Sequence, residues 1–167
     1  MNNDNKLKIR KKHRILFVCL GNICRSPAAE GIMRHLTELR GVEQLFHVDS
    51  AGIGNWHVGQ LPDSRMRRHG LRHGYHFDHH ARQICRDDFE RFDLLVGMDG
   101  ENLHDMALLA PDKASREKII DIAQFLRHHP HFRTVPDPYY GGEQDFETVI
   151  ELLEDACEGL LDHLMKQ

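Results

Sequence analysis

The chain has 167 residues, a formal net charge of −4, 40% hydrophobic residues and 29% charged residues. This length predicts one domain with a sizeable core, and the composition excludes a disordered or collagen-like chain. The small negative charge gives no general reason to expect nucleic-acid binding.

The first residues, MNNDNKLKIRKK, are polar and basic. We interpret residues 1–12 as a solvated tail and expect the folded domain over residues 13–167. The segment lacks the apolar stretch of a signal peptide, and the longest apolar runs are too short to cross a bilayer. We therefore expect a cytoplasmic protein without membrane insertion, whose four cysteines are reduced thiols.

Residues 14–19, RILFVC, are predicted to form a buried strand because the run is short and rich in strand formers. Ser26 and Pro27 are expected as the N-cap and the first residue of a helix. Apolar residues continue at helical spacing to Leu39, and Gly41 is expected to end the helix. The first unit is thus a strand, a short loop and a helix.

The same alternation continues downstream. Strands are predicted over residues 45–50, 92–98 and 118–122, and helices over residues 62–71, 101–110 and 145–165. Because parallel strands need crossover connections, the alternation predicts an α/β domain of three layers, with helices on both faces of a parallel sheet. Ligands bind at the carboxyl ends of the strands of such sheets, and the residues after Cys19 are expected there.

The loop LGNICR, between the first strand and the first helix, has the residues of an oxyanion-binding site. Its backbone N–H groups and the helix N-terminus can converge on one anion. Gly21 permits backbone angles that a side chain would resist, and Arg25 offers a planar fork of donors to a phosphate-like group. The same donors favour a thiolate at Cys19. We therefore predict that Cys19 attacks a phosphorus ester and forms a phosphocysteine.

A leaving group must be protonated, and a carboxylic acid is the usual donor. Asp137, between Pro136 and Pro138 in VPDPYYGG, is the candidate. Tyr139 and Tyr140 would form an aromatic wall against a flat substrate ring. On composition alone, a turn with two surface tyrosines is the simpler interpretation.

Five stretches follow one another along the chain: CLGNICRSPAAE, SAG…WH.G, HHARQI, FDLLVGMD and DPYYGG…DFETV. In this order they resemble the low-molecular-weight protein tyrosine phosphatases. The match runs from about Arg14 to the last helix. The resemblance implies a four-stranded parallel sheet, no metal and no organic cofactor. It also implies hydrolysis of phosphotyrosine in proteins, and of aryl phosphate monoesters, with inorganic phosphate as product and competitive ligand. We expect a monomer.

The resemblance implies Cys19 as nucleophile, Arg25 as phosphate binder and Asp137 as general acid and then base. It implies that the phosphate loop and its support comprise Leu20, Gly21, Asn22, Ile23, Cys24 and Ser26. Asn22 is expected to hold the shape of the loop, and Ser26 to donate a hydrogen bond to the thiolate.

Outside this loop, the resemblance implies that Glu30 and His79 form a supporting pair, and that Trp56, Tyr139 and Tyr140 line the phosphotyrosine cleft. It also implies that Cys24 can form a reversible disulfide with Cys19, which would protect the nucleophile from overoxidation.

Specific residues argue against three other functions. An arsenate reductase needs two further cysteines as a relay, but no partner follows Cys85 before Cys157, which we expect in the core. A protein arginine phosphatase tends to carry threonine where this chain has Ile23, and lacks the double tyrosine. A binding module without catalysis would lose Cys19 or Asp137.

A metal site is a further alternative, because the chain has 14 histidines. His69 and His73 are four residues apart and could share one face of a helix. No companion cysteine or carboxylate pattern accompanies them, so we interpret these histidines as solvated side chains.

Overall fold

The computed structural model describes residues 11–167, so most of the tail predicted over residues 1–12 lies outside the described residues. Four strands form one parallel sheet in the order β2-β1-β3-β4. The strands are β1 His13–Cys19, β2 Phe46–Gly52, β3 Leu94–Gly97 and β4 Ile119–Asp121. The predicted four-stranded parallel sheet is confirmed. β2 pairs with one edge of β1, and β3 pairs with the other edge. The strand order therefore reverses at β1, and the carboxyl end of β1 is a topological switch point.

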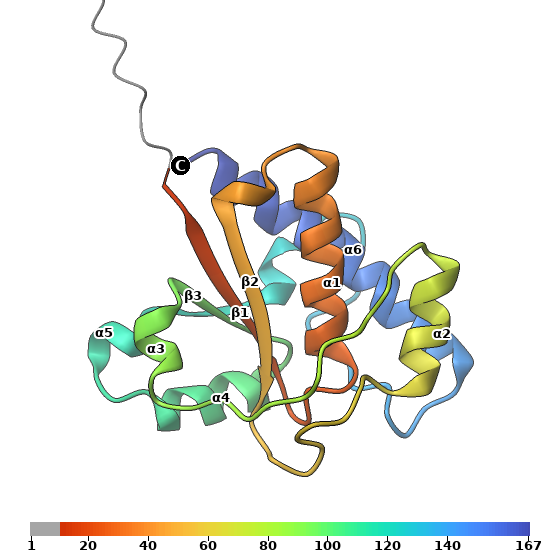
Figure 1. The fold of residues 1–167 in the computed structure, drawn as a ribbon, viewed down its shortest axis with the longest axis horizontal. Helices are drawn as coiled ribbons and strands as arrows, with labels where there is room; N and C mark the ends of the chain where they lie inside the picture. The colour runs from red at the N-terminus through yellow and green to blue at the C-terminus, as the bar shows by residue number, and fades with distance from the viewer. Residues whose placement is uncertain (1–10) are drawn as a thin grey trace, which may run out of the picture.

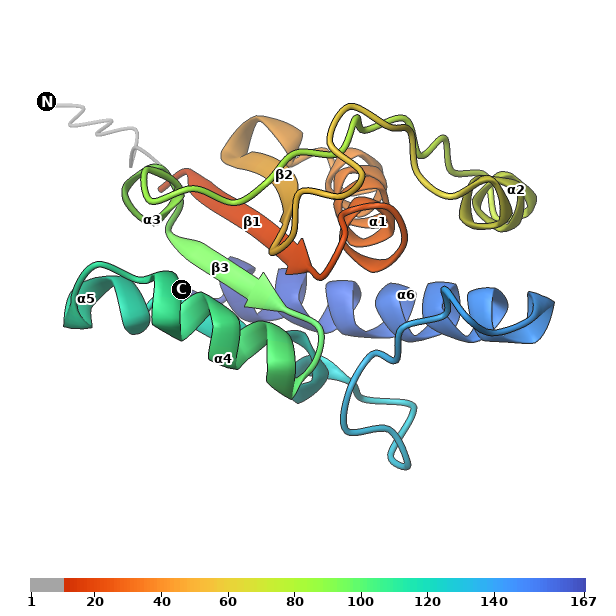
Figure 2. The same cartoon turned by 90° about the horizontal axis from the view of Figure 1, so that it is seen from below.

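Helices cover both faces of the sheet (Figures 1 and 2). On one side lie α1 Arg25–Leu39, α2 Ser64–Arg72 and α6 Glu143–Met165. On the other side lie the short helices α3 Asp88–Arg91 and α5 Lys113–Arg116, with α4 Gly100–Leu109. Two short 3-10 helices, η1 Glu43–Leu45 and η2 Ile122–Phe125, join the strands to their neighbours. No helix of residues 11–167 has the length and apolar character needed to span a membrane.

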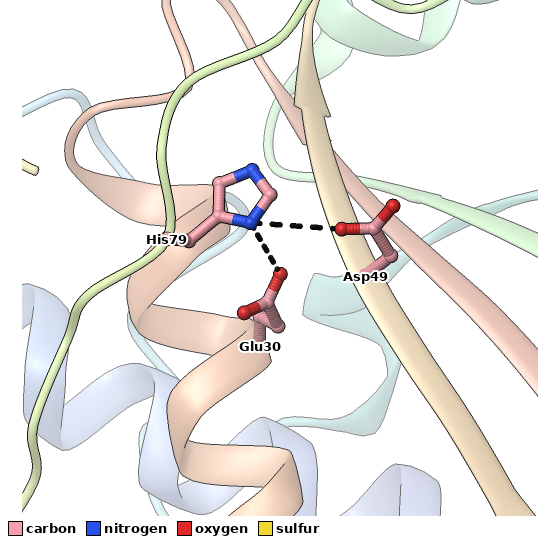
Figure 3. A group of neighbouring side chains, drawn as sticks. All are labelled: Glu30, Asp49 and His79. Carbon is pink, nitrogen blue, oxygen red and sulfur yellow. Dashed lines mark ion pairs between the residues drawn. The ribbon is translucent and has the colours of Figure 1, made fainter. Parts of the chain in front are cut away.

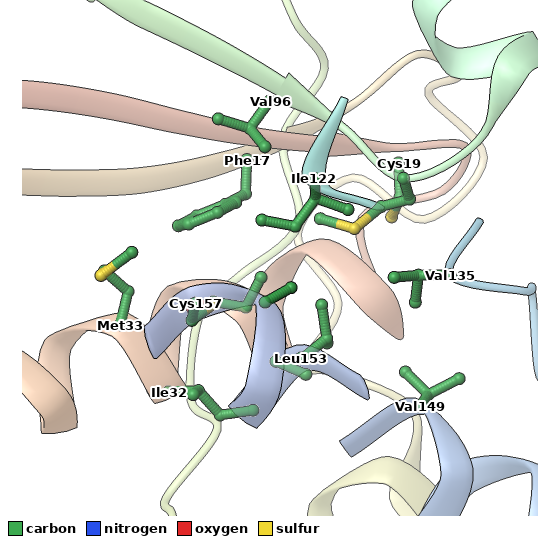
Figure 4. Packing of buried hydrophobic residues seen from close by; sticks show 14 of the residues in the cluster. Phe17, Cys19, Ile32, Met33, Val96, Ile122, Val135, Val149, Leu153 and Cys157 are labelled. Atoms are coloured by element: carbon green, nitrogen blue, oxygen red, sulfur yellow. The ribbon is translucent and has the colours of Figure 1, made fainter. Parts of the chain in front are cut away.

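The side chains of β1 alternate between two hydrophobic cores, as the pleat of a strand requires. Ile15 and Phe17 point into the core beneath α1 and α6, whereas Leu16 and Val18 point toward α3 and α4. In the larger core, Cys157 of α6 is fully buried among apolar side chains (Figure 4). Burial raises the pKa of the Cys157 thiol, and the prediction of a core thiol is confirmed.

The start of α1 differs from the prediction, because its N-cap is Cys24 and not Ser26. Ser26 lies in the first turn, where its hydroxyl accepts a hydrogen bond from Asn22 and pairs with the sulfur of Cys19. That hydroxyl is therefore engaged with the loop and does not cap the helix. The predicted end is confirmed: α1 stops before Gly41, which has a positive φ of 64° that suits glycine.

Candidate active site

The loop between β1 and α1 turns at Asn22, which has a positive φ of 59°, a conformation that asparagine tolerates better than most residues. Its buried amide nitrogen donates to the hydroxyls of Ser26 and Ser50, at 2.8 and 3.0 Å. Its amide oxygen accepts from the backbone N–H of Arg82 at 2.9 Å and lies 3.1 Å from Nε2 of His79. All the hydrogen-bonding capacity of Asn22 is thus used to hold the loop.

The end of β2 passes directly beneath this loop at Gly52. A side chain at Gly52 would come within 3.0 Å of the backbone of Gly21 and 3.1 Å of Asn22. The absence of a Cβ therefore lets the strand and the loop pack together. The strand register pairs Gly52 with Cys19. This close contact therefore also fixes the position of the loop relative to the carboxyl end of the sheet.

Cys19 lies at the base of the loop with only 3% of its surface exposed. Its sulfur is 3.0 Å from Oγ of Ser26. Because that oxygen already accepts from Asn22, and its other acceptor, the Ala51 carbonyl, is 3.5 Å away, the hydroxyl hydrogen is best placed to donate to Cys19. A donor at this distance stabilises a thiolate.

Arg25 is buried beside Cys19, and its guanidinium is held in one position. One terminal nitrogen donates to the carboxylate of Asp99 at 2.6 Å and to the carbonyl of Val135 at 3.1 Å. The other lies 3.7 Å from the carboxylate of Asp137. Burial opposes the charge of Arg25, yet Cys19 and Asp99 outweigh burial and raise the pKa of the guanidinium. Arg25 is therefore a fixed cation.

Asp99 is a site residue that the sequence reasoning missed. It is the N-cap of α4: one carboxylate oxygen accepts from the N–H of Asn102 at 2.8 Å, and the other holds Arg25. A signal for it exists in the sequence, because Asp99 closely follows the third strand, whose carboxyl end meets the same edge of the sheet as Cys19.

Asp137 stands in the wall of the site with 39% of its side chain exposed. One carboxylate oxygen accepts from the N–H of Tyr139 at 3.1 Å. The segment that carries it is tied down on both sides: Val135 donates to the carbonyl of Met98, and Arg65 donates to the carbonyl of Tyr139. Asp137 thus combines access to solvent with a held backbone.

The loop, Asp137 and a set of aromatic side chains enclose a cavity of about 350 Å³. Its lining comprises Cys19, Leu20, Gly21, Ile23, Cys24, Arg25, Trp56, His57, Asp137, Tyr139 and Tyr140. The structure brings together every predicted residue of the catalytic set and of the cleft. Trp56 and Tyr140 are 65% and 94% exposed, which leaves their rings free to contact a flat ligand. His57 was given no role in the sequence analysis, although it is the histidine of the WH.G motif and lies next to Trp56.

Glu30 and His79 meet behind the loop, together with Asp49 of β2 (Figure 3). Nδ1 of His79 lies 3.1 Å from Glu30 and 3.6 Å from Asp49. Ser50 donates to the same oxygen of Glu30 and accepts from Asn22. Three hydrogen bonds and the ion pair between His79 and Glu30 therefore link Asn22, Ser50, Glu30 and His79 in a closed ring. Because the Asn22 oxygen only accepts, Nε2 of His79 donates to it.

The ligand atoms of Glu30, Asp49 and His79 all lie within 4.8 Å of one another, a spacing that a metal ion could use. Both carboxylates already have cationic partners, however. Arg34 lies 3.4 Å from Glu30, and Arg82 lies 3.0 Å from Asp49. The donor set fits an ion-pair network better than a metal site.

The interpretation of His69 as a solvated side chain is wrong, because it is 1% exposed. Its two ring nitrogens face Glu147 and Glu143 at 2.8 and 2.5 Å. His73 is partly buried and pairs with Glu147 at 2.9 Å and with Glu154 at 3.3 Å. These carboxylates come from α6, more than seventy positions along the chain, which is why the spacing within α2 gave no signal of them.

The chain is similar to known proteins of one family. A family model described as low molecular weight phosphotyrosine protein phosphatase matches residues 14–167. A putative low molecular weight protein-tyrosine-phosphatase of Synechocystis is 45% identical over 154 residues, which are 92% of this chain and 98% of the relative.

Two solved structures also match. The crystal structure of a protein tyrosine phosphatase from Entamoeba histolytica, with Hepes in the active site, has a TM-score of 0.90 and 41% identity, covering 93% of this chain and 98% of that chain. The crystal structure of a drosophila arginine phosphatase has a TM-score of 0.78 and 35% identity, covering 89% and 96% of the two chains.

Proposed function

Because the chain belongs to the low molecular weight phosphotyrosine protein phosphatase family, we propose that its phosphatase reaction is carried out by Cys19, Arg25 and Asp137. The chain is a protein tyrosine phosphatase, a hydrolase that acts on phosphoproteins. The observation that supports the proposed roles is the convergence of these three side chains, from separate parts of the chain, on one cavity.

In the first step, the loop N–H groups and Arg25 bind the phosphoryl oxygens, and the sulfur of Cys19 attacks the phosphorus. The new P–S bond forms as the P–O bond to the aryl group breaks. Asp137 gives its proton to the leaving phenolate oxygen. Arg25 suits this step because a fixed cation stabilises the charge of the transferring group without reorganising.

In the second step, the Asp137 carboxylate takes a proton from a water molecule that attacks the phosphocysteine. The P–S bond breaks, the thiolate of Cys19 returns, and inorganic phosphate leaves. Ser26 stabilises that thiolate through the contact of 3.0 Å. Because phosphate has the same oxygens as the phosphoryl group of the substrate, we propose it as a competitive ligand.

The aromatic side chains that line the cavity, Trp56, Tyr139 and Tyr140, support phosphotyrosine proteins as the substrates. Tyr139 and Tyr140 meet edge to face with ring centroids 4.9 Å apart, and Trp56 stands elsewhere in the lining of the same cavity. Such rings stack on a phenyl group and offer little to an aliphatic phosphoserine. Rates on matched phosphotyrosine, phosphoserine and phosphoarginine peptides test this proposal. Preferential hydrolysis of phosphotyrosine is expected, and faster hydrolysis of phosphoarginine would overturn it.

Cys24 is proposed as a partner for Cys19 under oxidation. Peroxide would convert the thiolate of Cys19 to a sulfenic acid, and attack by the Cys24 sulfur would form the disulfide and release water. Burial and the nearby charges of Asp63 and Cys19 raise the pKa of the Cys24 thiol. Cys24 therefore stays protonated at neutral pH and leaves the attack on the phosphoryl group to Cys19, and its thiol proton departs in the water that is released when the disulfide forms.

The setting of the enzyme is also a proposal. We place the domain at residues 13–167 and the protein in the cytoplasm as a monomer, with no metal or organic cofactor in the reaction. The free thiols of Cys19, Cys24, Cys85 and Cys157 suit a reducing compartment.

A further inference from the structure

Among the side chains that line the cavity, His57 has no part in the reaction above. Its ring lies between the phosphate loop and the first wall tyrosine. A Cβ placed on Gly21 would be 3.1 Å from Cδ2 of His57 and 3.7 Å from Nε2. On the other side, the centroid of the ring is 6.1 Å from that of Tyr139, at a tilt of 49°. The Cδ2–Nε2 edge of His57 therefore faces the loop at the side of the cavity.

The orientation of this ring is fixed by its neighbours. Nδ1 of His57 lies 3.0 Å from the amide oxygen of Gln60, which only accepts, so Nδ1 is the donor. The backbone N–H of Gln60 donates to the carbonyl of His57, and its carbonyl accepts from Ala81. The segment is therefore held against the rest of the domain, and Nε2 is the nitrogen that can gain a proton.

The charges around His57 come from three parts of the fold. The β1–α1 loop contributes Cys19, Cys24 and Arg25, whose guanidinium is buried and paired with Asp99. The segment after Val135 contributes Asp137 and the phenols of Tyr139 and Tyr140. Arg65 lies next to Tyr139 but is paired with Asp63. Among the lining residues of the described chain, His57 is thus the one besides Arg25 that can carry a positive charge.

We propose that His57 is a specificity-determining residue that binds an acidic side chain next to the phosphotyrosine of a protein substrate. This inference rests on the proposed function, because it uses the same cavity. Arg25 and the loop amides take the phosphoryl oxygens, and the aromatic walls take the ring. An imidazolium at the side of the cavity then remains for an anion on a neighbouring residue of the peptide. Histidine gains this charge within the pH range of cells.

The test uses two phosphotyrosine peptides that differ only in having Glu or Gln on both sides of the phosphotyrosine. The readout is the ratio of kcat/KM for the Glu peptide over that for the Gln peptide, measured at pH 5.5 and at pH 8.5. Because the side chain of His57 is partly exposed, a ratio of about 2 to 5 is expected at pH 5.5, decreasing toward one at pH 8.5. The difference is expected in KM and not in kcat.

Three variants identify the residue responsible. His57→Gln is expected to give a ratio near one at both pH values, and His57→Lys to restore the preference and keep it at pH 8.5. His76→Gln, which changes an exposed histidine outside the cavity lining, is expected to behave as the wild type. A preference that survives in His57→Gln, or a ratio of one in the wild type, would overturn the inference while phosphotyrosine hydrolysis stands.

A further measurement separates binding of a neighbouring acid from an effect on the phosphate itself. p-Nitrophenyl phosphate has no neighbouring carboxylate. If His57→Gln raised KM for p-nitrophenyl phosphate as much as for the Glu peptide, His57 would act on the phosphoryl group, and the inference would be wrong. If neither peptide were hydrolysed by the wild type, the proposed function would fail, and this inference with it.

Discussion

The carboxylate of Asp99, the N-cap of α4, holds the guanidinium of Arg25, the first residue of α1, at 2.6 Å. The end of β3 thereby positions the cation that serves the loop after β1. Because a charge-assisted hydrogen bond of this kind contributes about 1.5–3 kcal/mol, its loss should be visible in the kinetics.

Asp99→Asn is expected to lower kcat/KM for p-nitrophenyl phosphate about 10- to 100-fold, and to weaken inhibition by inorganic phosphate. Asparagine can still cap α4, so the fold should be retained. Asp112→Asn is the matched control, because Asp112 caps α5 in the same way without contacting an arginine in the site. Equal kinetics in both variants would remove Asp99 as a positioning residue.

Asp137→Asn tests the general acid. The loss of rate should be large, about 100-fold or more, with phenyl phosphate, whose leaving group needs a proton. It should be much smaller with p-nitrophenyl phosphate, whose leaving group departs readily as an anion. Single-turnover release of the two phenols measures this difference. Similar losses with both substrates would assign the proton to another group.

Peroxide treatment tests the pairing of the loop cysteines. We expect a peptide map of the oxidised protein to show Cys19 joined to Cys24, and a thiol reductant to restore activity. In Cys24→Ser, the same treatment should inactivate irreversibly, whereas Cys85→Ser should recover like the wild type. A bond between Cys19 and Cys85 would instead support the relay of an arsenate reductase.

The contact between α2 and α6 should depend on pH. Burial opposes the charge of His73, but its hydrogen bond to Glu147 and the charge of Glu154 raise its pKa. The contribution of His73 to the stability of the fold is therefore complete below about pH 6.5 and is lost as the pH rises through the raised pKa. Burial likewise opposes the charge of Glu147, but hydrogen bonds to His69 and His73 lower its pKa. The contribution of Glu147 to the stability of the fold is therefore complete above about pH 4.5 and is lost as the pH falls through the lowered pKa.

Thermal unfolding at different pH values tests this pH dependence of stability. The decrease in Tm caused by His73→Gln should be largest near pH 6 and should shrink by pH 9, with His76→Gln as the control. A decrease that did not change with pH would mean that His73 contributes through packing alone.

The order of strands and helices was predictable because buried runs and helical spacing are local patterns. The phosphate loop was predictable for the same reason, since Cys19 and Arg25 are close in the sequence. Asp99 and His57 were missed because their roles depend on contacts across the sheet and across the cavity. The cap of α1 was placed at Ser26 because its hydroxyl suits a cap, yet Asn22 and Cys19 engage that hydroxyl.

The central claim is that Cys19 carries the phosphoryl group during the reaction. The most direct measurement is a peptide map of Asp137→Asn, mixed with p-nitrophenyl phosphate and quenched in acid, because this variant lacks the base for the second step. One phosphoryl group is expected on the peptide of Cys19, and none in the double variant with Cys19→Ser. A phosphoryl group on another residue, or turnover by Cys19→Ser, would contradict it.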